Sequence, residues 1–280
     1  MIDLLLRSVP DMRKAGFGGL SALWCYFAVA VLVLGGCGAP SQRADKADLL
    51  TASDETDVGK RARIRLELAV NYFSEGKTTI ALDEVKQSIA VDPGLFEAHN
   101  LRGLIYMRLN EVSLAEDSFL HALALNPKAA TVQHNYGLLL CQQGRMAGAS
   151  EMFSAALANP AYFERSKTLM IQGLCHAKAG QAQAAESSLL RAYEIDPVNP
   201  VVAYNLGLGL YMRGEYVQAQ RYLSRLNQSD LANAESLWLG AKTAKAMADT
   251  PTLRLLGQTL VQRFPSSKEA LWLERKSFYE

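Results

Sequence analysis

One pattern of small residues recurs along the 280-residue chain at a nearly constant spacing. A small residue is followed twelve positions later by an alanine at Ala69 and Ala81, Gly103 and Ala115, Gly137 and Ala149, Gly173 and Ala185, and Gly207 and Ala219. Successive alanines of this column lie 34, 34, 36 and 34 residues apart. A second small position precedes a proline at Ser88 and Pro93, Ala122 and Pro127, Ala156 and Pro160, and Ala192 and Pro197. Such a period restricts the chain to a stack of similar units.

Each column has a physical reason. Two antiparallel helices approach closely only where small side chains face each other, as Gly137 and Ala149 would at a crossing. Proline lacks an N–H group and disfavours helix in the residue before it, so Asn126-Pro127 ends a second helix. The period is that of the tetratricopeptide repeat, a pair of helices joined by a turn. We therefore expect an all-α superhelix, an α-solenoid of about six helix-turn-helix repeats plus a C-terminal capping helix. The expected domain is 60–280, with repeats at about 62–95, 96–129, 130–163, 166–199, 200–232 and 233–265 and an end helix at 266–280.

The N-terminus has the composition of an export signal. Arg13 and Lys14 precede a mostly apolar stretch, Leu20 to Leu34, and small residues follow it. The tetrad Leu34-Gly35-Gly36-Cys37 resembles the lipobox of bacterial lipoproteins. This resemblance implies that a signal peptide, 1–36, is removed and that Cys37 carries fatty acyl chains such as palmitate.

Three further expectations concern this end of the chain. Met12 is the expected initiator, because Met12-Arg13-Lys14 has the form of a signal start. Gly38, rather than aspartate, follows the lipobox cysteine, and the resemblance then implies sorting to the outer membrane, on its periplasmic face. Residues 37–59 are small and polar and predict a flexible tether. The alternative is an uncleaved membrane anchor, since Ala15 to Gly36 is almost long enough to span a bilayer.

The charge balance of the mature chain restricts its possible functions, and its cysteines predict a disulfide. Without residues 1–36 the chain has 26 basic and 26 acidic side chains, which provides no electrostatic attraction for nucleic acid. Apart from the lipidated Cys37, the mature chain then keeps two cysteines, Cys141 and Cys175. Both lie late in neighbouring first helices, and in an oxidising compartment we expect a disulfide between them. The alternative is that both are buried small hydrophobic residues without a bridge.

An apolar strip is expected along the first helices. Repeat positions that point into the concave surface carry mostly large apolar residues. We call these residues the concave strip: Leu66, Val70, Phe73, Leu104, Met107, Leu138, Tyr204, Leu208 and Tyr211. Such a strip suits an apolar or amphipathic peptide segment of a partner protein. The alternative, that these side chains belong to the core between repeats, is expected to hold for about half of them.

No catalytic, metal or cofactor motif accompanies this pattern. The sequence has no HExxH, no GxSxG and no phosphate-binding glycine loop, so neither an enzyme nor a small-molecule substrate is expected. The four histidines, expected in the groove or at the surface, are too scattered for a metal site: His99, His121, His134 and His176.

Several stretches of the mature chain resemble one family of exported repeat proteins. They are NYGLLLCQQGR (135–145), ANPAYFERSKTLMIQGLCHAKAGQ (158–181), AESLWLGAKTAKAMAD (234–249) and LVQRFPSSKEA (260–270). These segments resemble the PilF/PilW lipoproteins of type IV pilus biogenesis. The resemblance implies a pilot protein that binds the outer-membrane secretin and supports its assembly. The alternative is an adaptor for other periplasmic partners, such as peptidoglycan synthases or hydrolases.

Overall fold

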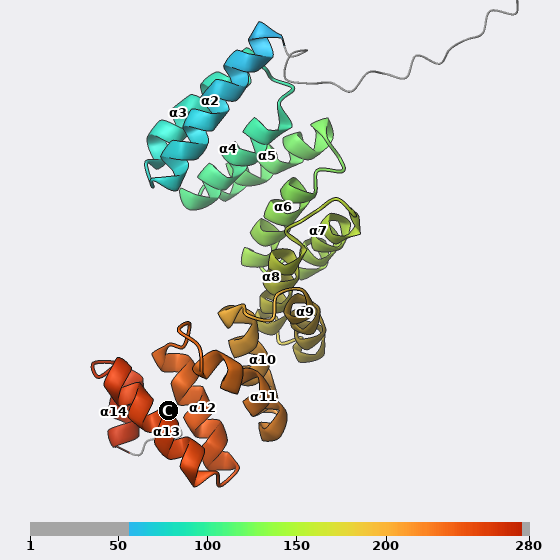
Figure 1. Cartoon of the computed structure of the whole chain (residues 1–280). Coiled ribbons are helices and arrows are strands. Elements are labelled where there is room, and N and C mark those ends of the chain that lie inside the picture. Colours follow the sequence, from blue (N-terminus) through green and yellow to red (C-terminus); the bar gives the residue numbers. More distant parts are fainter. Residues whose placement is uncertain (1–55, 276–280) are drawn as a thin grey trace, which may run out of the picture. The chain divides into compact units, whose positions relative to one another are not determined.

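The computed structural model describes residues 56–275, which form helices joined by short turns (Figure 1). The predicted signal peptide, Cys37 and nearly all of the predicted tether lie outside the described residues. The six helix pairs are α2 (Asp57–Ser74) and α3 (Thr78–Val91), α4 (Phe96–Arg108) and α5 (Val112–Leu125), α6 (Ala130–Gln142) and α7 (Met146–Ala158), α8 (Arg165–Lys178) and α9 (Ala182–Ile195), α10 (Pro200–Met212) and α11 (Tyr216–Asn227), and α12 (Ala234–Ala246) and α13 (Thr250–Arg263). A short helix, α14 (Lys268–Glu274), follows the last pair. The expected all-helical repeat fold is confirmed.

The two small-residue columns mark where the helices of a pair touch. A Cβ atom placed on Gly137 would lie 2.9 Å from the Phe153 ring, and one on Gly207 would lie 2.5 Å from Leu223. No side chain fits at such separations, so glycine is required there for the close approach. The alanines that follow twelve residues later are buried in the same crossings.

The first and last helices of the stack begin at side-chain caps. The sequence predicts a tether up to residue 59, but α2 starts at Asp57. The Thr56 side chain accepts a hydrogen bond from the Gly59 N–H, and Asp57 stands in the first turn, where a negative charge is favourable. At the other end of the stack, the Ser267 side chain accepts a hydrogen bond from the Ala270 N–H and caps α14.

The turns inside the repeats use backbone with positive φ. Glycine supplies it in four of them, whereas Asn110 (φ 61°) and Ala248 (φ 59°) adopt it in the other two. Asparagine tolerates this conformation, but for alanine it costs about 1–2 kcal/mol. The turn of the sixth repeat, which contains Ala248, is therefore the least favourable of these six turns.

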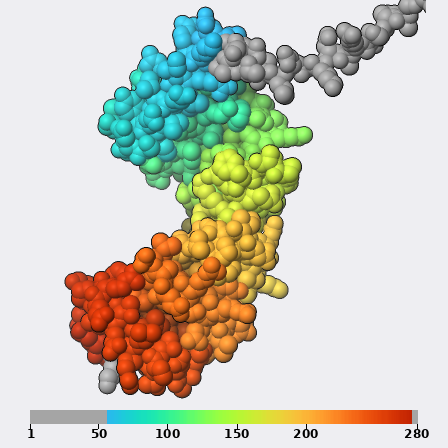
Figure 2. All heavy atoms as spheres, in the orientation of Figure 1, coloured from blue at the N-terminus to red at the C-terminus, as the bar shows by residue number. Residues whose placement is uncertain are grey.

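The first helices form one surface of the stack. Each first helix contacts the first helix of the next repeat, from α2 and α4 through to α10 and α12. Contacts between successive second helices are marginal at most in the described part of the chain. The first helices therefore lie closer to one another than the second helices do, and they line the inner surface of the superhelix. Figure 2 shows the repeats following one another in chain order.

No helix among residues 56–275 combines the length and the apolar character needed to cross a membrane.

Candidate functional site

The concave strip is half-buried along most of its length. Seven of its residues pack against core clusters while keeping part of their surface accessible: Leu66, Phe73, Leu104, Met107, Tyr204, Leu208 and Tyr211. Leu138 is also half-buried, and Val70 is 47% exposed. Most of the strip thus contributes to the core between repeats and to the inner surface at the same time.

At its N-terminal end the strip is partly covered by a basic side chain. The guanidinium carbon of Arg108 lies 3.8 Å from the centre of the Phe73 ring. Arg108 Nη1 also donates a hydrogen bond of 2.7 Å to the Phe73 carbonyl oxygen. Phe73 is therefore held by a cation–π contact, and Val70 is the more accessible apolar side chain of the first repeat.

At its C-terminal end the strip borders an aromatic hollow. Tyr204 and Leu208 line a hollow of about 180 Å³ together with Trp238, Lys242 and Trp272. The two indole rings lie 6.2 Å apart, centre to centre. Lys242 Nζ lies 5.9 Å from the centre of the Trp238 ring. Aromatic side chains are enriched at surfaces that bind other proteins.

Two carboxylates contribute negative charge to this hollow. Glu235 and Glu269 stand in its wall, and Lys268 Nζ lies 3.7 Å from Glu269 Oε1. Burial, helped by these two carboxylates, raises the pKa of Tyr204. The phenol therefore stays protonated and can donate a hydrogen bond.

Sequence reasoning missed Trp238 and Trp272, although a signal was present. The letters ESLWL at Glu235–Leu239 recur almost unchanged as EALWL at Glu269–Leu273, 34 residues later. The two tryptophans thus occupy the same position of successive units. Only the structure places them beside Tyr204.

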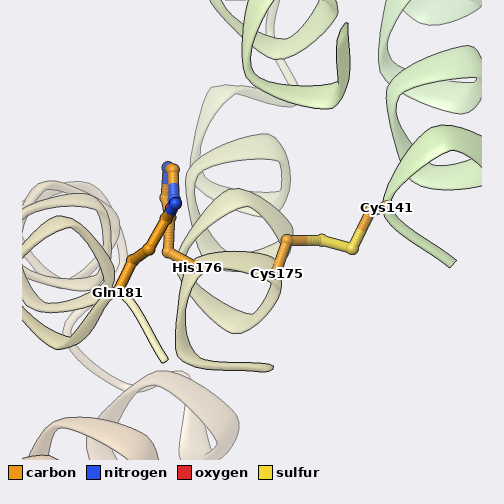
Figure 3. The surroundings of a disulfide bond; sticks show 4 residues. All are labelled: Cys141, Cys175, His176 and Gln181. Carbon is orange, nitrogen blue, oxygen red and sulfur yellow. A yellow bond between two sulfur atoms is a disulfide. The ribbon is translucent and has the colours of Figure 1, made fainter. Parts of the chain in front are cut away.

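A disulfide joins the third and fourth repeats. The Sγ atoms of Cys141 and Cys175 are bonded, with the Cα atoms 5.9 Å apart, and both residues are buried (Figure 3). The bridge links the last turns of α6 and α8. His176, the next residue, donates from Nδ1 to Gln181 Oε1 at 2.6 Å and takes no part in the bridge (Figure 3).

The connection between α7 and α8, where the repeat spacing is 36 residues instead of 34, has its own buried contacts. Tyr162, in the connection between α7 and α8, packs against Ala130 and Ala156. Its hydroxyl lies 2.9 Å from Thr168 Oγ1, which in turn lies 2.8 Å from His134 Nδ1. These three buried polar side chains form one chain of hydrogen bonds.

Two histidines lie elsewhere than the sequence predicts. The expected place for His99 and His134 is the groove or the surface, but they are only 3% and 2% exposed. Burial lowers the pKa of both, to about 4 for His134. Each has a hydrogen-bond partner, the Pro93 carbonyl oxygen for His99 and Thr168 for His134, which explains how the repeat core accommodates them. Within residues 56–275, no cluster of three or more potential metal ligands is formed.

Comparisons with known proteins agree with this architecture. Models of the tetratricopeptide repeat match residues 96–129 and 137–200. The type IV pilus assembly protein PilF of Pseudomonas aeruginosa is 28% identical over 204 residues, which cover 73% of this chain and 81% of PilF.

Two solved structures extend the similarity to the whole stack. The crystal structure of PilW, described as a widely conserved type IV pilus biogenesis factor, has a TM-score of 0.68 and 28% identity, covering 78% of this chain and 99% of PilW. The structure of Pseudomonas aeruginosa PilF has a TM-score of 0.70 and 26% identity, covering 79% and 100%. The chain is a tetratricopeptide-repeat protein, homologous to PilF and similar in structure to PilW.

Proposed function

We propose that this protein is an outer-membrane lipoprotein that acts as a pilot and assembly factor for the type IV pilus secretin. The observation that carries the proposal is the agreement with the PilW and PilF structures over essentially their whole lengths, 99% and 100%. Both relatives are described by their part in the type IV pilus, so a role in pilus assembly is the part of the proposal with the most support.

The partner would bind along the first helices. The concave strip and the aromatic hollow together present half-buried apolar side chains and a few charges on one surface. A surface of this kind suits an apolar or amphipathic segment, with the aromatic side chains as anchors. The secretin subunit is the partner implied by the family resemblance.

The proposed lipid anchor is supported by the sequence alone. Changing Cys37→Ser should abolish incorporation of labelled fatty acid and release the protein from the outer-membrane fraction, because the acylated side chain is lost. Metabolic labelling followed by membrane fractionation measures both. Labelling and fractionation equal to those of the unchanged protein would rule out Cys37 as the anchor.

Affinity capture from detergent-solubilised cell envelopes tests whether the secretin is the partner. The protein should retain the secretin, and Val70→Asp should reduce this at least tenfold, because a charge would enter the accessible part of the strip. Val217→Asp is the matched control: Val217 is 72% exposed on a second helix, α11, and its variant should bind normally. Equal loss in both variants would contradict binding along the strip. Capture of cell-wall synthases or hydrolases, without secretin, would favour the adaptor function instead.

A further inference from the structure

At every junction between successive first helices, the same two repeat positions lie on the two neighbouring helices. The pair consists of the twelfth residue of one repeat and the tenth of the next, counted from the predicted repeat starts at about 62, 96, 130, 166, 200 and 233. The five pairs among the described residues are Phe73 and Ile105, Met107 and Leu139, Cys141 and Cys175, Ala177 and Gly209, and Tyr211 and Lys242. The first two pairs share core clusters, the third is the disulfide, and in the fifth Lys242 Nζ lies 5.9 Å from the Tyr211 ring centre.

The fourth junction is different, because both members of its pair are small. Ala177 and Gly209 line a cavity of about 330 Å³ between the fourth and fifth repeats, with leucines among its walls. A Cβ atom placed on Gly209 would meet no other atom within 4 Å. Gly207, two residues earlier, is required by its contact with Leu223, but packing gives no such reason for Gly209.

The charges at this cavity are already paired. Arg213 Nη2 lies 2.9 Å from Glu186 Oε2, and Arg213 Nε lies 2.7 Å from Glu215 Oε1. A charged side chain that entered would lose water without gaining a free partner, whereas an apolar side chain would bury its surface against leucines. The cavity therefore favours an uncharged apolar occupant.

The cavity is continuous with the concave strip. Leu208 belongs to both, and Met212, another wall residue, is 76% exposed on the same helix. A polypeptide that lies along the strip therefore passes the opening. At the first two junctions the same place is filled by the protein's own phenylalanine, methionine, isoleucine or leucine, which indicates the size of side chain that fits.

We propose that the cavity between the fourth and fifth repeats is an anchor pocket for one large apolar side chain of the bound partner. This inference rests on the proposed function and adds the place where the partner is held. A side chain inserted into a preformed apolar pocket and surrounded by weaker contacts has the character of a binding hot spot.

The test compares two substitutions at the same position. Gly209→Leu fills the pocket, whereas Gly209→Ala gains helix propensity and leaves most of the volume open. Both should melt at or above the temperature of the unchanged protein. Only Gly209→Leu should weaken binding of the purified secretin, by at least tenfold in an equilibrium titration, and Gly209→Ala should stay within twofold. Ala177→Leu, which fills the pocket from the opposite wall, should repeat the loss and covers the case in which Gly209→Leu does not fold.

The outcomes separate the two proposals. If the filled variants bind the secretin normally while Val70→Asp does not, the pocket is not an anchor and the proposed function stands. If the unchanged protein does not bind the secretin, the proposed function fails and the anchor proposal falls with it. Sedimentation would reveal a third result: self-association that Gly209→Leu abolishes would mean that a second copy of the chain occupies the pocket, which also overturns the proposal.

Discussion

Replacing both Cys141 and Cys175 with alanine is expected to lower the free energy of unfolding by about 3–4 kcal/mol. The bridge closes a loop between residues 34 apart in sequence, and its loss restores conformational freedom to the unfolded chain. For a domain of this size the melting temperature should fall by roughly 10 °C. The loss should be largest at the third and fourth repeats, because each repeat contacts mainly its neighbours.

Urea unfolding followed by circular dichroism measures this effect. Dithiothreitol should reproduce the loss in the unchanged protein and have no effect on the double variant, which serves as the control. Identical unfolding curves for the oxidised and reduced unchanged protein would contradict a stabilising role for the bridge.

Acidification is expected to destabilise the protein through His134. Burial, with a smaller contribution from Lys167 and against the opposing effect of Glu164, lowers the pKa of this ring to about 4. An unfolded histidine accepts a proton near a pH of about 6.5. Between these values the unfolded chain holds the extra proton, so stability is fully present above about pH 6.5 and is lost as the pH falls toward 4. The loss would reach about 3 kcal/mol at the acidic end of this window.

Two measurements check this prediction. The ring resonances of His134, assigned by their absence from His134→Gln, should titrate near pH 4. Unfolding experiments between about pH 6.5 and 4 should give a smaller loss of stability for His134→Gln than for the unchanged protein. A His134 titration near the ordinary histidine value would mean that the ring is accessible in solution and that the predicted effect is absent.

Sequence alone determined the repeat architecture because its signals are local and periodic. Glycine and alanine recur in the first five repeats where two helices approach closely, as at Gly137 and Ala149, and a proline follows every second helix except α11. The same repeat register placed Cys141 and Cys175 late in neighbouring first helices, and the disulfide between them could therefore be predicted. The start of α2 was misjudged because Thr56 acts through one capping hydrogen bond, a signal without periodicity.

Tertiary structure decided the properties that depend on neighbours from different repeats. The repeat pattern explains Gly207 but not Gly209. Only the structure shows that a Cβ atom on Gly207 would meet Leu223, whereas one on Gly209 would face open space, because residues two apart on a helix point in different directions. His134 is buried because Thr168, from the next repeat, reaches its ring. Helix periodicity specifies which residues face inward, but only the stacking of repeats specifies what each of them meets there.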